Sequence, residues 1–202
     1  MGGAIRFANS PVDGVLVLLK RRTVKFTQTI LPGAWIIESE FLEDDRGYFA
    51  RFFSQPDFAE RGLETQFPEW STSFNRTKGT IRGMHFQIAP FDEAKIVRCI
   101  SGAIFDVLVD VRPSSREYGR WFGIELSAGD PRSVYIPKGV AHGFQALMDN
   151  TELNYFISSP HSPKFSSGFR WDDPQVGISW PQLPTKISLR DQKLGSFADL
   201  QC

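Results

Sequence analysis

Residues 103–112 read AIFDVLVDVR, and this stretch says most about the fold. Every second residue from Phe105 to Val111 is apolar, and three of these four are β-branched. Asp106 and Asp110 fall on the opposite side, which two aliphatic residues interrupt. Because successive side chains of a strand alternate between its faces, this pattern predicts a strand with one strongly buried face.

Similar short apolar segments follow at regular intervals, separated by turn residues. The expected strands are residues 121–126, 133–136 and 142–147, and the expected turns are 113–115, 128–131 and 137–139. Turn signals spaced in this way favour an all-β sandwich or barrel over an alternating α/β layer structure. We expect the helices to be short, such as residues 55–62, which have proline near the start and glycine at the end.

The length of 202 residues suits one large domain with a hydrophobic core. We expect residues 24–202 to form this single domain and residues 1–23 to be an extension whose role the sequence does not reveal. The apolar run 14–19 is far too short to span a membrane. The basic cluster 20–22 follows this run, which is the wrong order for a secretory signal.

Charge and cysteine content narrow the function classes. The 23 basic and 23 acidic residues give a formal net charge of zero, so no strong basic field is present to bind nucleic acid. Cys99 lies in an apolar run and Cys202 is the last residue, which argues against a bridge between them. Two isolated cysteines are typical of a reducing compartment, and we expect a cytoplasmic protein without a membrane partner.

Residues 79–87 read GTIRGMHFQ and contain the first candidate for chemistry. Here His85, which can move protons near neutral pH, follows the permanently charged Arg82 by three residues, and Lys95 lies ten residues further on. A single histidine is more often structural than catalytic, so the spacing alone does not assign a role.

Four further stretches accompany this motif in the same order along the chain. They are DDRGYF at 44–49, KIVRCISG at 95–102, IPKGVAHGF at 136–144 and GFRWDDP at 168–174. Together the five stretches resemble the dTDP-4-dehydrorhamnose 3,5-epimerase family, from about Phe26 to Asp191. The resemblance implies a cupin-type double-stranded β-helix, or jelly-roll barrel, with a few short helices. It also implies an active site in the mouth of the barrel and a homodimer.

The resemblance further implies the substrate and the reaction, namely epimerisation of a nucleotide-activated 4-keto-6-deoxy sugar such as dTDP-4-dehydro-6-deoxyglucose. A proton beside a ketone is acidic because the resulting carbanion is delocalised onto oxygen as an enolate. Inversion of such a centre needs a base on one face, an acid on the other, and positive charge near the oxygen.

Four residues match the catalytic positions of the family. The resemblance makes His85 the base, Asp191 the carboxylate that orients it, Tyr155 the acid on the opposite face, and Lys95 the cation at the enolate oxygen. The residues alone favour more ordinary roles: a solvated acid near the C-terminus for Asp191, a barrel-lining aromatic for Tyr155, and a surface-seeking lysine for Lys95.

Other positions match substrate contacts. Arg46 and Arg82 match positions near the diphosphate, where guanidinium groups bind phosphoryl oxygens well, although a surface ion pair is the alternative for Arg46. Gln87 is the last residue of the 79–87 motif, and we also expect it to contact the substrate. His142 lies near the site in the family, although a buried, hydrogen-bonded structural histidine is an equal alternative.

The chain departs from the family pattern at several of these recognition positions. His161 stands where many members have a tyrosine that stacks on thymine, and Glu93 stands in place of the glutamine of a Gln-Gly-Lys run. Arg51 occupies a position that is often glutamate, and residues 69–75 differ from the usual glutamine and asparagine contacts. We therefore expect retained chemistry with altered recognition of the sugar nucleotide.

The histidines give no sign of a metal centre. Metal-binding cupins carry a His-x-His pair, but the second position of that pair is Gln87 here. His142 and His161 are hard to assemble with His85 into a ligand shell, so the sequence favours a site without a metal or other cofactor.

Three alternatives to a double epimerase stay open at this point. One is a single-centre epimerase or ketoisomerase on the same scaffold. Another is a barrel that binds sugar nucleotides without turning them over, since a fold does not fix a function. The third is a metal-dependent cupin of another chemistry, such as an oxygenase.

Overall fold

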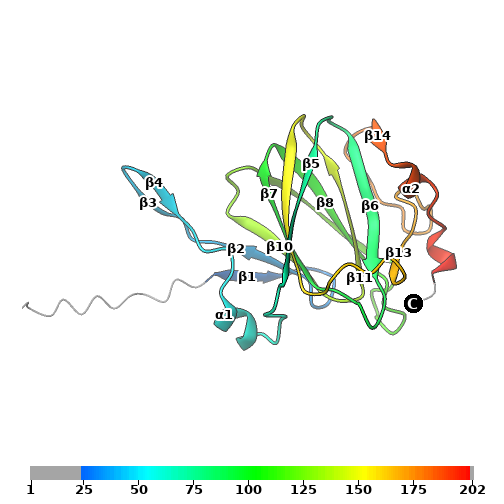
Figure 1. Ribbon diagram of the computed structural model, residues 1–202, viewed down its shortest axis with the longest axis horizontal. Helices are drawn as coiled ribbons and strands as arrows, with labels where there is room; N and C mark the ends of the chain where they lie inside the picture. The colour runs from blue at the N-terminus through cyan, green and yellow to red at the C-terminus, as the bar shows by residue number, and fades with distance from the viewer. Residues whose placement is uncertain (1–23, 201–202) are drawn as a thin grey trace, which may run out of the picture.

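The computed structural model describes residues 24–200 and consists mainly of two antiparallel sheets (Figure 1). The first sheet contains, in spatial order, β1 (Lys25–Gln28), β2 (Trp35–Glu38), β10 (Arg132–Ile136), β7 (Lys95–Ser101), β12 (Thr151–Ile157) and β5 (Glu69–Asn75). The second contains β13 (Ser166–Gly168), β6 (Thr80–Gln87), β11 (Val140–Ala146), β8 (Ala103–Asp110) and β9 (Trp121–Ser127), with β14 (Lys186–Ile187) parallel to β6.

The chain passes repeatedly from one sheet to the other, as at β5 to β6, β6 to β7 and β10 to β11. This crossing closes a jelly-roll barrel and confirms the predicted all-β, cupin-type fold. A separate hairpin, β3 (Leu42–Asp44) and β4 (Gly47–Phe49), projects from the barrel (Figure 1). The expected extension 1–23 and Cys202 lie outside the described residues.

The helices are short, as predicted. Helix α1 (Gln55–Glu60) has Pro56 in its first turn, where the missing N–H costs nothing. It is followed by Gly62, whose φ of 66° is in the left-handed region that favours glycine. Phe58 on α1 is fully buried against the outer face of the first sheet, next to Ile96 and Tyr135. No helix within residues 24–200 is long and apolar enough to cross a membrane.

Strand β8 differs from the sequence prediction, because both of its faces are buried. Ile104 and Leu108 point into the barrel core, and the carboxylates of Asp106 and Asp110 are also fully buried on that face. Val107 lies on the outer face and is completely covered there. The prediction of one buried face was therefore wrong. The reason is that the C-terminal segment packs over the outside of the sheet.

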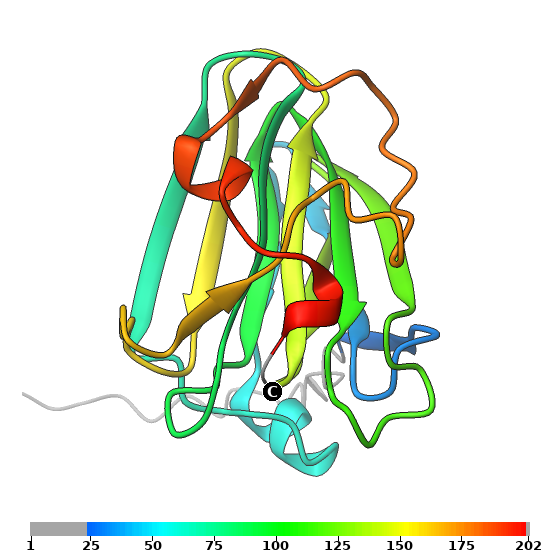
Figure 2. The ribbon, with the colours of Figure 1, turned by 90° about the vertical axis from the view of Figure 1, so that its right-hand side faces the viewer.

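This C-terminal segment, residues 169–200, crosses the outer face of the second sheet (Figure 2). It includes α2 (Leu189–Gln192) and the 3-10 helix η1 (Phe197–Asp199). Phe197 and Phe169 are fully buried, with their ring centroids 5.1 Å apart. The backbone N–H of Phe197 also donates to Asp173 Oδ2 at 2.8 Å. These contacts fix the path of the chain that carries Asp191.

We expect Phe197→Ala to lower the free energy of unfolding by about 3–5 kcal/mol, because it removes a large buried ring and leaves a cavity. Leu183→Ala is the control, since Leu183 is 88% exposed and its truncation is expected to cost less than about 0.5 kcal/mol. Urea denaturation followed by circular dichroism measures both. Equal losses in the two variants would contradict the anchoring role of Phe197.

Candidate active site

A pocket of about 420 Å³ opens between the two sheets at one side of the barrel. All the predicted site residues except Arg46 line it: His85, Tyr155, Asp191, Lys95, Arg82, Gln87, Glu93, His142 and His161. They come from β6, β7, β11 and β12, from the loops beside these strands, and from α2. The structure therefore gathers residues that are more than one hundred positions apart in the sequence.

His85 and Asp191 form a close pair. His85 Nε2 lies 2.8 Å from Asp191 Oδ1, and the N–H of Gly83 donates to the other carboxylate oxygen at 3.4 Å. Helix α2 begins after Ser188, whose hydroxyl accepts a hydrogen bond from the N–H of Asp191 at 3.0 Å. Asp191 is only 3% exposed. It is not the solvated acid that its sequence context favours.

The electrostatics of this pair suit a general base. Burial pushes the pKa of Asp191 upward, but the hydrogen bond and charge of His85 and the N–H of Gly83 outweigh burial, so the pKa lies below its usual value. Since a carboxylate accepts hydrogen bonds, Nε2 of His85 is the donor. The lone pair of Nδ1 is then available to take a proton in the pocket.

Tyr155 approaches from the opposite sheet. It lies on β12, paired with Ser71 of β5 on one side and with Val97 of β7 on the other. Burial raises the pKa of Tyr155 well above its usual value and the carboxylate of Asp106 adds to the rise, while Arg82 and the hydroxyl of Ser73 oppose it. The phenol therefore keeps its proton at neutral pH and can act as an acid.

His142 and Asp106 form a second imidazole–carboxylate pair, and His142 on β11 is the cross-strand partner of His85 on β6. His142 Nε2 lies 2.7 Å from Asp106 Oδ1, and both side chains are buried. The ring of His142 packs edge-on against Tyr155, with a centroid distance of 5.9 Å. His142 is thus a hydrogen-bonded buried histidine that also lines the pocket, so both alternatives considered from sequence apply.

Lys95 does not extend to the surface. Its ammonium forms an ion pair with Glu93, with an Nζ to Oε1 distance of 2.7 Å, and the two side chains are 12% and 10% exposed. Gln87 donates to the other oxygen of Glu93 at 2.7 Å. The structure therefore links three predicted site residues to one another inside the pocket.

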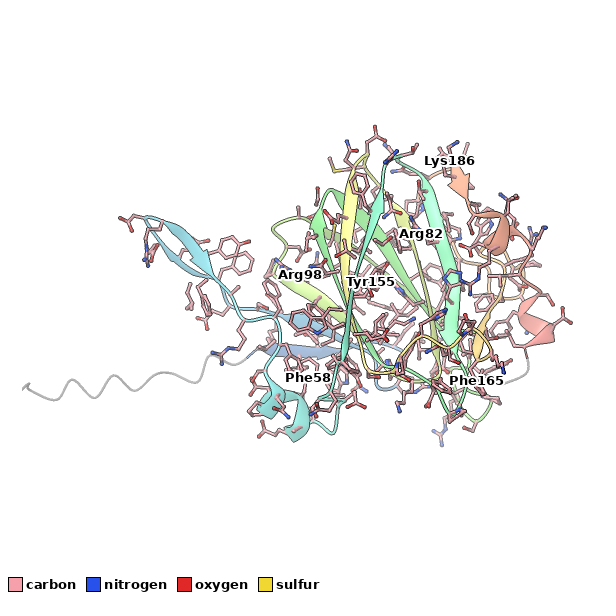
Figure 3. All side chains as sticks on the ribbon, in the orientation of Figure 1. Phe58, Arg82, Arg98, Tyr155, Phe165 and Lys186 are labelled. Carbon is pink, nitrogen blue, oxygen red and sulfur yellow. The ribbon has the colours of Figure 1, made fainter. Side chains whose placement is uncertain are left out.

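Arg82 lies on β6, in the sheet opposite to that of Tyr155, and both residues are labelled in Figure 3. Its Nε donates to Asn75 Oδ1 at 2.8 Å, and one terminal nitrogen donates to the carbonyl of Phe74 at 3.3 Å. These bonds tie the guanidinium to β5 across the cleft. The remaining donors are free to bind an anion.

Sequence reasoning missed Arg190, a second guanidinium that lines the pocket. It donates to the hydroxyl of Ser166 at 2.8 Å and lies on α2, directly before Asp191. The sequence did contain a signal for Arg190, because it directly precedes Asp191, which was already expected at the site.

Arg46 lies elsewhere. It is on the projecting β3–β4 hairpin, its side chain is 86% exposed, and it is bonded to Asp44. Within one chain it does not reach the pocket lining. Its predicted contact with a diphosphate stays a prediction.

Within residues 24–200, no group of three or more histidine, cysteine, aspartate or glutamate side chains is arranged to hold a metal ion. The carboxylates of Asp191, Glu93 and Asp106 are instead each paired with one imidazole or ammonium group.

The fold and the site define a class of protein, a cupin-type barrel whose pocket contains an imidazole–carboxylate pair and a phenol on opposing sheets, together with an ammonium. Such a site suits proton transfer at a carbon beside a carbonyl. The chain matches the family described as dTDP-4-dehydrorhamnose 3,5-epimerase over residues 28–199, and it belongs to that family.

Individual relatives agree with this assignment. A dTDP-4-dehydrorhamnose 3,5-epimerase of Methanothermobacter thermautotrophicus is 45% identical over 78% of this chain and 84% of its own length. NovW, a 4-keto-6-deoxy sugar epimerase of Streptomyces spheroides, superposes with a TM-score of 0.83 at 34% identity, covering 88% of this chain and 89% of NovW. The epimerase RmlC of Legionella pneumophila, solved with dTDP-4-keto-L-rhamnose, gives 0.83 at 30% identity over 89% and 95%.

The family resemblance predicted from sequence is thereby confirmed. The prediction of an isomerase that epimerises a nucleotide-activated 4-keto-6-deoxy sugar is confirmed as well. The comparisons support this main prediction over the alternatives of a single-centre enzyme or a simple binder.

We expect Asp191→Asn to be less stable than the wild type by about 1–3 kcal/mol at neutral pH, because a buried charged hydrogen bond is lost. Since the pKa of Asp191 is lower in the folded chain than in the unfolded chain, the carboxylate contributes its full stability above the unfolded value of about 3.9. The gap between the two proteins should narrow as the pH falls through the native pKa.

Urea denaturation between pH 2.5 and pH 7 measures this gap. Asp45→Asn is the control, because Asp45 is exposed on the hairpin and its replacement is expected to cost little at every pH. A gap for Asp191→Asn that stays constant down to pH 2.5 would contradict the assigned role of the charge.

Proposed function

We propose that this protein inverts the carbons on both sides of the ketone, C3 and C5, in a dTDP-linked 4-keto-6-deoxy sugar. The observation that supports this most is the placement of His85 and Tyr155 on β6 and β12, which belong to opposing sheets but line one pocket. A sugar ring between them has a base on one face and an acid on the other.

The first step removes a proton from carbon. Nδ1 of His85 takes the proton, and the electron pair of the broken C–H bond moves into the ring as an enolate with negative charge on O4. Asp191 stabilises the imidazolium that forms, since it accepts the hydrogen bond from Nε2. Lys95 donates to the enolate oxygen, where charge develops in the transition state.

The second step returns a proton from the other face. The phenol of Tyr155 protonates the same carbon, the enolate electrons form the new C–H bond, and the configuration is inverted. The raised pKa of Tyr155 keeps this proton in place before the step and makes the phenolate a strong base afterwards, so solvent reprotonates it. His85 releases its proton to solvent, which restores the site. This chemistry needs no cofactor.

The nucleotide end of the substrate meets the remaining pocket residues. Arg82 and Arg190 supply donors for the diphosphate, since guanidinium groups bind phosphoryl oxygens in pairs. The exposed ring of His161 offers a flat surface for the base. His142 contacts the sugar from beneath, next to Tyr155. The dTDP-4-keto-L-rhamnose in the Legionella pneumophila relative supports the choice of nucleotide sugar.

We also infer that residues 24–202 work as a single domain in the cytoplasm. Cys99 supports a reducing compartment, because it is a free, buried thiol, and burial raises its pKa to about 11.

Incubation of the protein with dTDP-4-keto-6-deoxyglucose in deuterated water tests the proposal. We expect deuterium at C3 and C5, seen by mass spectrometry and proton NMR. His85→Ala should slow both exchanges by at least about 10²-fold, since it removes the base. Circular dichroism confirms that the variant is folded.

Tyr155→Phe separates the two faces in the same experiment. It should still exchange protons through His85 but invert the centres much more slowly, because the acid of the second face is missing. If the wild-type protein exchanged no deuterium at either carbon, the proposed reaction would be wrong.

We propose a homodimer as the working form. The outer face of β5 carries Trp70 and Phe74, which are 75% and 47% exposed, and the projecting hairpin carries Tyr48 and Phe49, 51% and 58% exposed. A second copy of the chain would cover these aromatic side chains. The hairpin would then carry Arg46 to the other copy, which is the way Arg46 can meet a diphosphate.

We expect light scattering to give a mass near twice 22.8 kDa. Phe49→Asp should shift this mass toward one chain, because it places a charge in the apolar contact. Leu183→Asp is the matched control, since Leu183 is 88% exposed and lies on neither β5 nor the hairpin, so its replacement should leave the mass unchanged. A wild-type protein with the mass of one chain would rule out the dimer.

A further inference from the structure

Glu93 lies two residues before Lys95 and has both carboxylate oxygens engaged. Oε1 accepts from the ammonium of Lys95 at 2.7 Å, and Oε2 accepts from Nε2 of Gln87 at 2.7 Å. The Glu93 and Lys95 side chains are only 10% and 12% exposed. The carboxylate is therefore already bonded on both oxygens before a ligand enters.

Gln87 fixes the direction of this carboxylate. It is 3% exposed, and its Nε2 also lies 3.0 and 3.2 Å from the carbonyls of Phe91 and Pro160, so the two N–H groups are shared among three acceptors. Its Oε1 accepts from the N–H of Ser162 at 2.7 Å. The amide thus joins the loop that follows β6 to the loop between β12 and β13, and it holds Glu93 against them.

We propose that Glu93 is a positioning residue that holds the ammonium of Lys95 toward the ketone oxygen of the substrate, an inference that rests on the proposed function. An ammonium has three N–H donors, so the one bonded to Glu93 leaves two for the pocket. A donor that is in place before charge develops on the oxygen needs no reorganisation during the reaction.

Without Glu93, the ammonium has competing acceptors nearby. Glu69 lines the same pocket, and it lies in one cross-strand row with Ile157 and Lys95. The substrate diphosphate is another acceptor for a released lysine. Glu93 therefore keeps the ammonium of Lys95 at the end of the pocket where the ketone reacts. The ion pair also neutralises part of the positive charge of the ammonium.

An assay without substrate tests the positioning itself. Competitive acetylation with limiting acetic anhydride, followed by peptide mass spectrometry, reports how accessible Nζ of Lys95 is. In Glu93→Gln the rate should rise about tenfold, because the loss of a buried charged hydrogen bond releases the nitrogen. Glu38→Gln is the matched control, since Glu38 pairs with Lys25 at 2.9 Å on the surface and its loss should raise Lys25 acetylation about twofold or less.

A double-mutant cycle on turnover tests the action through Lys95. Glu93→Gln should lower kcat about tenfold, with little change in KM, because the donor is misplaced but the substrate still binds. Lys95→Met should lower kcat by about 10²-fold or more, because it removes the donor. Adding Glu93→Gln to Lys95→Met should cost nothing further.

The outcomes separate the possible roles. Glu93→Gln could instead raise KM, or it could lower kcat further in the Lys95→Met background. Either result would overturn the positioning role and make Glu93 a direct substrate contact or a structural residue. If the wild-type protein shows no turnover, the proposed function fails, and the acetylation rates still decide whether Glu93 holds Lys95. If Glu93→Gln does not fold, Glu93→Asp, which keeps the charge but shortens the reach, replaces it and should give smaller changes of the same sign.

Discussion

The packing of the C-terminal segment against the outer face of the second sheet is the contact on which the site depends. Phe169 and Phe197 bury their rings against the outer side of β6, β8 and β11, and the intervening chain forms β14, which pairs with β6. There, α2 places Asp191 within 2.8 Å of His85. The apolar contact outside the barrel thereby sets the position of Asp191 beside His85 inside it.

Inside the barrel, pairing explains the arrangement of charge. A buried carboxylate is costly unless it has a partner, because it loses the hydration that it has in water. Asp191 has His85, Asp106 has His142 and Glu93 has Lys95. Each pair also fixes the direction of a proton donor or acceptor, so the same contacts that make burial tolerable also organise the chemistry.

The sequence predicted the barrel well, because period-two strands and turn residues are local signals, and α1 followed from Pro56 and Gly62. It missed the second buried face of β8, because the covering rings at Phe169 and Phe197 come from far along the chain. The same separation along the chain explains why the burial of Asp191 could not be predicted locally. Taken without the rest of the chain, its sequence context resembles that of a solvated acid. The family motifs placed it beside His85, whereas Arg190 carried no motif of its own.

Most of the chain's departures from the family pattern lie around His85, Tyr155 and Asp191, while Glu93 is bonded directly to Lys95. His85, Tyr155 and Asp191 line one pocket, and each is held by its own strand or helix. The altered positions, such as His161 and Glu69, line the pocket from a loop and from the edge strand β5. Substitutions there leave the strand pairings around the base unchanged. The barrel can therefore change its sugar nucleotide while it keeps one way of moving a proton.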